Sequence, residues 1–117
     1  MGAKYRVVAL AVVMVAVLSG CKPTLWSWGS NDEGQLGTGT SADGWAPARG
    51  GGQKWTNLSA GGTHTCGVRP DNFAWCWGSN SSGQLGIGTL EDQSTPTMVI
   101  YGAYSSVVTG GSHTCGI

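Results

Sequence analysis

The hydrophobic positions of this chain fall into short runs separated by glycine-rich polar stretches. The runs at 26–29, 64–68, 73–78, 97–101, 104–109 and 113–117 have the length and the aromatic, valine and threonine content typical of β-strands. The 21 glycines among 117 residues disfavour helices between them. The region 46–54 predicts a poor strand, because glycines occupy positions 50–52. The pattern therefore predicts an all-β protein with room for one domain.

The first 21 residues have a different pattern. Lys4 and Arg6 precede an unbroken apolar run over 7–18, which is short for a bilayer span and typical of a secretory signal. The motif "LSGC" that ends at Cys21 resembles a bacterial lipobox, in which the cysteine thiol is lipidated and the peptide is cut just before it. We expect a lipoprotein signal peptide over 1–20 and a lipidated Cys21 with a short tether over 21–24. An ordinary cleaved signal and an uncleaved anchor are the alternatives.

Cleavage before Cys21 changes the charge balance. The remaining chain has four basic and six acidic side chains, a formal charge of about −2. Without a basic stripe, no nucleic-acid partner is expected. The expected location is the cell envelope, extracytoplasmic and held to the membrane by lipid on Cys21. Disulfides persist in such a compartment.

The chain repeats itself with a period of 49 residues. "WSWGSNDEGQLGTGT" at 26–40 returns as "WCWGSNSSGQLGIGT" at 75–89, and "GGTHTCGV" at 61–68 returns as "GGSHTCGI" at 110–117. The two units are predicted to occupy 25–72 and 73–117, the second of them truncated. The positions expected to be structural in the repeat are Trp28, Gly34, Leu36, Gly37 and His64, and their counterparts Trp77, Gly83, Leu85, Gly86 and His113.

A period of 40 to 50 residues rich in glycine and short strands is typical of one four-stranded propeller blade per repeat. Within "GSNxxGQLGxGT", Asn31, Gly34, Asn80 and Gly83 are residues that tolerate positive φ in tight turns. Leu36 and Leu85 are then expected to be buried plugs between blades. A phosphate-binding role is not favoured, because the lysine of a P-loop is missing.

The elements "WxWGSNxxGQLGxGT" and "GGxHTCG" resemble the repeat of the RCC1 (regulator of chromosome condensation) family over residues 25–117. The resemblance implies β-propeller blades, and two units imply an incomplete propeller. We expect a fragment or a truncated gene product, with self-association through open blade edges as the main alternative.

The resemblance says less about function, because one fold hosts many functions. The nuclear founder of the family exchanges nucleotide on a small GTPase and binds chromatin. Neither activity is expected of an exported and mildly acidic chain. The secreted bacterial relatives include a propeller that inhibits β-lactamase, and they favour binding to an extracytoplasmic protein.

Two cysteines flank the turn "RPDNF" and are predicted to face each other across an antiparallel hairpin. Pairing residues whose numbers sum to 142 sets Cys66 opposite Cys76, at a spacing that a disulfide accepts. The first unit has Ser27 at the position of Cys76, since no earlier "HTC" strand precedes it. Cys115 is expected to be an unpaired thiol. The rival interpretation is a metal site built from His64, Cys66, Cys76, His113 and Cys115.

Catalysis has little support in the sequence, which contains no nucleophile elbow and no HExxH. Asp32-Glu33 and Glu91-Asp92 are most simply solvated turn charges. No cofactor is expected. The leading hypothesis is a membrane-anchored extracytoplasmic scaffold or binding module for a protein or glycan partner, and not an enzyme. The alternatives are the metal site and a truncated gene fragment without function.

Overall fold

The computed structural model describes residues 4–8, 12–15, 24–50 and 52–117, which form ten β-strands in three sheets and no helix. The first sheet has the order β2-β1-β3-β4 and contains β1 (Lys4–Val8), β2 (Val12–Val15), β3 (Thr24–Gly29) and β4 (Gly44–Arg49). Strand β1 runs parallel to β3, whereas β4 runs antiparallel to it.

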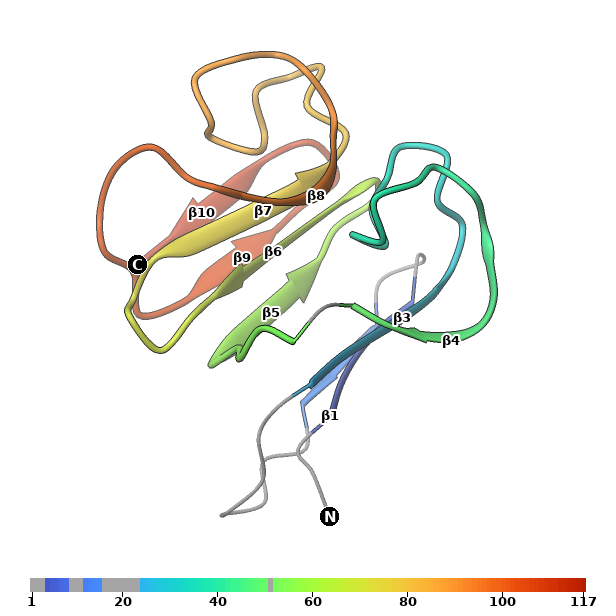
Figure 1. The fold of residues 1–117 in the computed structure, drawn as a ribbon. Coiled ribbons are helices and arrows are strands. Elements are labelled where there is room, and N and C mark those ends of the chain that lie inside the picture. The colour runs from blue at the N-terminus through green and yellow to red at the C-terminus, as the bar shows by residue number, and fades with distance from the viewer. Residues whose placement is uncertain (1–3, 9–11, 16–23, 51) are drawn as a thin grey trace.

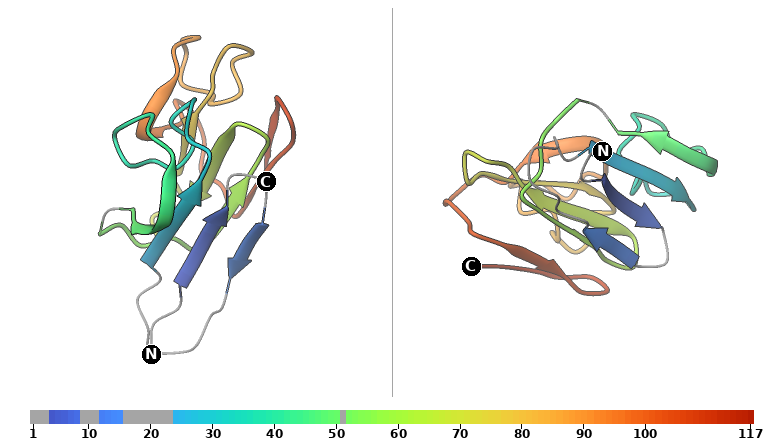
Figure 2. Two further views of the ribbon diagram at one scale, coloured as in Figure 1. Left: turned by 90° about the vertical axis from the view of Figure 1, so that its right-hand side faces the viewer. Right: turned by 90° about the horizontal axis from the view of Figure 1, so that it is seen from below.

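The second sheet is a four-stranded antiparallel meander. It contains β5 (Asn57–Ala60), β6 (His64–Val68), β7 (Ala74–Gly78) and β8 (Gln93–Met98) in chain order. The third sheet pairs β9 (Val107–Thr109) with β10 (Thr114–Gly116). The meander lies between the other two sheets, with Leu25 of β3 packed against one face and Val107 of β9 packed against the other (Figures 1 and 2).

The sheets are out of phase with the sequence repeat. A shift of 49 residues carries β4 onto β8 and β6 onto the segment that holds β10. The complete four-stranded sheet therefore takes β5 and β6 from the first unit and β7 and β8 from the second. The expected boundary at 72/73 falls inside this sheet, within the β6–β7 hairpin. The complete blade consequently straddles the two sequence units.

The strands follow the apolar pattern closely in the centre of the chain and less closely at its edges. The expected strand at 64–68 is confirmed as β6, and β7 begins one residue later than expected. The expectation at 97–101 is wrong, because the outer strand β8 is the polar segment QSTPTM and the apolar residues 99–101 follow it. Strand β5 has one buried apolar side chain, Leu58, which is too weak a pattern to predict it.

Two hydrophobic layers cover the two faces of the second sheet. On one face, Trp77 packs with Leu25, Trp55 and Leu58, and Trp75 lies against this cluster. On the other face, Cys66, Val68, Ala74 and Cys76 pack with Leu85 and Val107. Because successive residues of a strand point to opposite faces, the alternation Ala74-Trp75-Cys76-Trp77 serves both layers. Burial of apolar surface in these layers is what holds the three sheets together.

The segment expected to be a signal peptide contains β1 and β2, and Cys21 lies outside the described residues. Signal cleavage and lipidation are processing events, and strand pairing does not test them. They stay predictions. No helix in the described part of the chain is long and apolar enough to cross a membrane.

Candidate interaction surface

Two long loops project from the same end of the sheets and form what we call the loop rim: residues 30–43 between β3 and β4, and residues 79–92 between β7 and β8 (Figure 1). The first loop is organised by Asn31, whose side chain is fully buried. Its Nδ2 donates to the carbonyls of Thr40 and Ala42, both at 2.8 Å, and its Oδ1 accepts from the Leu36 amide at 2.9 Å. The Asn31 amide in turn donates to Oδ1 of Asp43 at 2.8 Å.

The second loop repeats this network with Asn80, which is also fully buried. Its Nδ2 donates to the carbonyls of Thr89 at 2.8 Å and Glu91 at 3.0 Å, and its Oδ1 accepts from the Leu85 amide at 3.0 Å. The Asn80 amide donates to Oδ1 of Asp92 at 2.6 Å. One side-chain amide thus ties together the start, middle and end of each loop, and a fully satisfied polar network of this kind rigidifies the segment it joins.

Asn31 and Asn80 lie in tight turns as expected, because the Asn31 carbonyl accepts from the Gly34 amide at 2.8 Å and the Asn80 carbonyl accepts from the Gly83 amide at 2.9 Å. Gly34 and Gly83 do adopt positive φ, at 79° and 74°. Among the described residues, the one non-glycine with positive φ is Asn72, so Asn31 and Asn80 do not adopt the positive φ that the sequence suggested. Their side chains have the further role of tying each loop together. Asp43 and Asp92 likewise hold the loops and are more than solvated charges. The recurrence of Asn and Asp at a spacing of 12 in both units was the signal for this pairing.

The loop rim is joined to the neighbouring sheet through Gln35. Its carbonyl accepts hydrogen bonds from Trp77 Nε1 at 2.9 Å and from Thr65 Oγ1 at 3.0 Å. Gly37 allows the indole to approach, because a Cβ at that position would lie 2.7 Å from Trp77 Nε1. Leu36 and Leu85 are both buried, and Leu85 belongs to the layer against β9. The loops are therefore part of the packing between blades.

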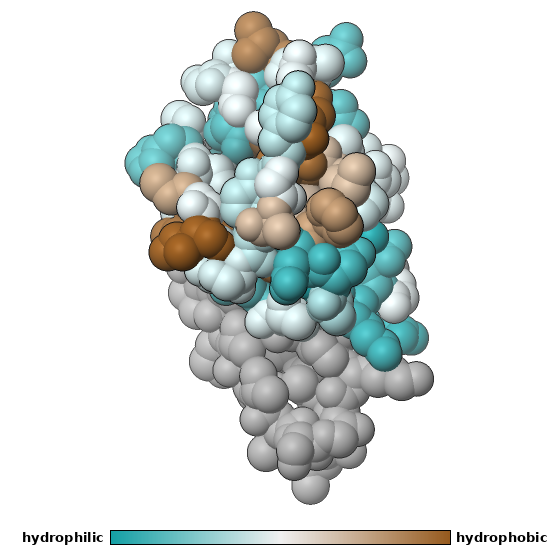
Figure 3. Space-filling view, turned by 90° about the vertical axis from the view of Figure 1, so that its left-hand side faces the viewer, coloured by the Kyte–Doolittle hydropathy of each residue, from teal (hydrophilic) through white to brown (hydrophobic). Residues whose placement is uncertain are grey.

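The buried positions of the two loops carry the same residues, whereas several of their exposed positions carry different ones. Asp32 and Glu33 of the first loop correspond to Ser81 and Ser82 of the second, and Ser41 corresponds to Leu90, which is 67% exposed. Further large apolar side chains are exposed at the end of β8 and after it, and in the third sheet or directly after it, namely Met98, Ile100, Tyr101, Val108 and Ile117. Figure 3 shows hydrophobic side chains in several separate patches on the face that carries these segments.

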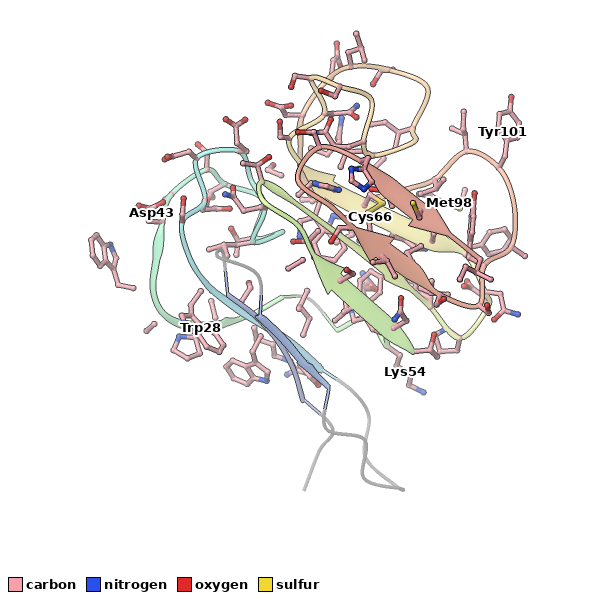
Figure 4. The ribbon with its side chains drawn as sticks, turned by 180° about the vertical axis from the view of Figure 1, so that it is seen from behind. Trp28, Asp43, Lys54, Cys66, Met98 and Tyr101 are labelled. Atoms are coloured by element: carbon pink, nitrogen blue, oxygen red, sulfur yellow. A yellow bond between two sulfur atoms is a disulfide. The ribbon has the colours of Figure 1, made fainter. Side chains whose placement is uncertain are left out.

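Charge is distributed unevenly between the two ends of the sheets. The loop rim carries the acids Asp32, Glu33, Asp43, Glu91 and Asp92. A hydrogen bond with Asp92, together with partial desolvation and repulsion by Asp92 and Asp32, raises the pKa of Glu33. The basic residues Arg49 and Lys54 lie at or beyond the far end of β4, and Figure 4 shows Lys54 well away from Asp43. The loop rim is thus an acidic end of the molecule.

The expected disulfide is confirmed. Cys66 and Cys76 are bonded, their Cα atoms lie 4.1 Å apart, and the two residues face each other in the β6–β7 register. Cys115 has a free and exposed thiol. Ser27 is buried, and its hydroxyl donates to the Leu36 carbonyl at 2.9 Å.

The two histidines lie in different environments. His64 is fully buried, and its Nε2 forms a hydrogen bond of 2.9 Å with Thr114 Oγ1. Burial lowers the pKa of His64. His113, its counterpart, is exposed. The described residues hold no group of three or more metal-ligating side chains, and the disulfide uses two of the five donors of the alternative metal site.

Comparison with known proteins places these features in a family. The model of the regulator of chromosome condensation (RCC1) repeat matches residues 24–68 and 71–117, and a second model of that repeat matches residues 55–84. No curated protein matches the chain significantly.

Solved structures of similar fold include Prp20p from Saccharomyces cerevisiae, with a TM-score of 0.69 and 19% identity over 87% of this chain. Human WBSCR16 is also similar, with a TM-score of 0.64 and 23% identity over 91% of this chain. The chain spans 27% and 34% of those two proteins. The sheets are RCC1-type propeller blades that do not close into a ring, as expected of an incomplete propeller.

Proposed function

The chain belongs to the RCC1 repeat family, and from this premise we propose that it is a membrane-anchored extracytoplasmic module that binds a protein partner through its loop rim and is not a catalyst. One observation carries the proposal: the buried framework of the two rim loops is the same, whereas several of their exposed side chains differ. Rigid loops with variable tips are the usual basis of a binding surface.

The direction of β3 supports a separation between the loop rim and the proposed anchor. Thr24, the first residue of β3, follows Cys21 by three positions, and Gly29 at the other end leads directly into the first rim loop. A strand of this length extends roughly 17–20 Å. Lipid on Cys21 would therefore hold one end of the sheets near the bilayer and present the loop rim to the surroundings.

The charge of the loop rim suggests the chemistry of the partner. Five acidic side chains gather there without bases among them, so a partner surface with lysine and arginine is favoured, and complementary charge would mainly speed association. The exposed Leu90 supplies an apolar contact beside the acids. The yeast Prp20p is described as binding Gsp1p and histones, which supports a protein over a small molecule as partner.

The anchor is tested by metabolic labelling with palmitate in a bacterial host. The wild-type chain is expected to take up label and to fractionate with membranes, and Cys21→Ser is expected to lose both properties. Cys115→Ser is the matched control and should keep them. Label that persists in Cys21→Ser would contradict lipidation at this residue.

The loop rim is tested by cross-linking in the cell envelope. Wild-type protein is expected to capture a protein partner, and the double charge reversal Asp32→Lys/Glu33→Lys should lower its recovery roughly tenfold or more at low salt. The control Lys54→Glu changes charge at the opposite end and should leave recovery unchanged. Equal loss in both variants would show that the loop rim is not the contact surface.

A further inference from the structure

A cavity of about 330 Å³ lies between the second rim loop and the third sheet. Its lining includes Gln84, Leu85 and Gly86 from the loop and Thr114 from β10. Thr114 Oγ1 donates to the Gln84 carbonyl at 2.7 Å. The question is what this cavity is shaped to hold.

The 49-residue repeat supplies the answer, because the same place one unit earlier is filled. There Gln35, Gly37 and Thr65 correspond to Gln84, Gly86 and Thr114. The indole of Trp77 lies against Gly37, and its Nε1 donates to the Gln35 carbonyl beside the Thr65 hydroxyl. At the cavity, the bond from Thr114 to the Gln84 carbonyl repeats the bond from Thr65 to the Gln35 carbonyl. The space beside it corresponds to the space that the Trp77 indole fills one unit earlier. The cavity therefore has the walls of a tryptophan site.

The strand that would deliver such an indole is defined by the β6–β7 register. Thr65 faces Trp77 and Cys66 faces Cys76 in that antiparallel pair. Strand β10 is the counterpart of β6, and β3, which begins the "WSWG" copy, is the counterpart of β7. An antiparallel β10–β3 pair would place Trp28 opposite Thr114 and Ser27 opposite Cys115. It would join β9–β10 to β3–β4 in the order of the complete sheet β5-β6-β7-β8.

Strands β3 and β10 of one copy are not paired, because they belong to different sheets. The second sheet separates β3 from β10, and Figures 2 and 4 show the two strands on opposite sides of the molecule. In the full chain β1 runs along β3 in the parallel direction, with Val7 facing Ser27. The cleavage before Cys21 that we propose above would remove β1 and free that edge for an antiparallel strand, and on this point the inference rests on the proposed function.

We propose that β10 of one copy binds β3 of a second copy of this chain, with Trp28 of the second copy in the cavity lined by Gln84, Gly86 and Thr114. The contact is head-to-tail, because the two surfaces differ, and a contact of this kind forms a ring when its rotation closes.

The first test uses Ser27→Cys in the exported protein. This change puts a thiol opposite Cys115 of the second copy, in the arrangement that Cys66 and Cys76 have within one chain. We expect intermolecular disulfide-linked species on non-reducing gels, with peptide mapping that joins positions 27 and 115. The added change Cys115→Ser should abolish them. Ala48→Cys is the matched control, because Ala48 faces Ser27 from β4 and is exposed, and it should not cross-link to Cys115. A bond from Cys115 to a different protein, or no bond at all, overturns the proposal.

The second test does not depend on a new cysteine. Trp28→Ala should weaken association about 30-fold or more, as for a buried aromatic anchor. Sedimentation of the processed protein measures this association. Gly86→Ala, which narrows the cavity, should also weaken association. Gly88→Ala is the control, because Gly88 has a similar positive φ but lies outside the cavity lining, and it should leave association unchanged. The Cys66–Cys76 disulfide, checked by mass, verifies folding of each variant. Unchanged association in Trp28→Ala and Gly86→Ala overturns the proposal.

Failure of export and failure of assembly can be told apart. Intact mass shows whether the leader has been removed in the cell. A protease site inserted between residues 21 and 24 allows the leader to be released from the folded full chain in vitro. If natural processing is absent, the proposed anchoring fails. If the Ser27→Cys chain still forms no bond to Cys115 after release in vitro, the assembly proposal fails.

Discussion

The indole Nε1 of Trp77 donates a hydrogen bond to the carbonyl of Gln35, 42 residues earlier, at 2.9 Å. This bond fastens the first rim loop to the centre of the next sheet. Trp77 also packs against Trp55, with 5.4 Å between the two ring centroids. Trp55 is a second fully buried indole, and its Nε1 has no hydrogen-bond partner within the described residues. The two tryptophans therefore offer a matched pair for measuring the bond.

We predict that Trp77→Phe lowers the free energy of unfolding by about 1 kcal/mol more than Trp55→Phe. Both changes remove similar apolar surface from one cluster, but the first also removes the bond to Gln35. Urea unfolding followed by far-UV circular dichroism measures the difference. Equal losses would mean that the Gln35 bond contributes nothing net to stability.

The disulfide should be a main contributor to stability. It closes an 11-residue loop, and the chain-entropy model gives about 3 kcal/mol for its effect on the unfolded state. The double change Cys66→Ala/Cys76→Ala should lower the free energy of unfolding by about this amount, and reductant should act similarly on the wild type. Cys115→Ser is the control and should have no effect, since its thiol is exposed and free.

The buried Asn80 should be essential to the second rim loop. Asn80→Ala removes three hydrogen bonds and leaves the Leu85 amide without its side-chain acceptor, so we expect a loss of about 2–4 kcal/mol. Ser81→Ala, at the exposed neighbouring position, should change stability by less than about 0.5 kcal/mol. Hydrogen exchange would locate the effect: faster exchange in residues 79–92 is expected, and uniform exchange across the chain would contradict a local role.

His64 should make stability depend on pH. Burial lowers its pKa in the folded state below the value of about 6.5 in the unfolded chain. The unfolded state then binds the proton more readily, so stability is full above pH 6.5 and falls as the pH drops below it toward the folded pKa. Urea midpoints at pH 7.5 and 5.5 test this expectation.

The variant His64→Gln should reduce this dependence on pH, because it removes the titrating ring. His113→Gln serves as the control, since His113 is exposed and affects the pKa of His64 less than burial does, and it should retain most of the wild-type dependence. A His64→Gln protein whose midpoint shifts with pH as much as that of the wild type would assign the effect to the carboxyl groups.

The central hairpin could be predicted almost completely from the sequence. The turn residues between Cys66 and Cys76 and the alternation along both strands determine which residues face each other, and the structure has this register. The outer strands could not be predicted as well. Strand β8 is polar, and β5 has one buried apolar residue, so these segments become strands because a neighbouring edge offers backbone partners.

By itself the sequence determined the all-β class, the 49-residue repeat and the disulfide, since these follow from local turn chemistry, alternation and self-comparison. The tertiary structure decided how the units divide among blades and what the loop residues that recur in both units do. Asn31 and Asn80 look like turn residues in the sequence, yet their side-chain Nδ2 atoms also donate to carbonyls 9 and 11 residues further along the chain. Contacts of that kind depend on how the loop closes in space, and no periodicity along the chain encodes them.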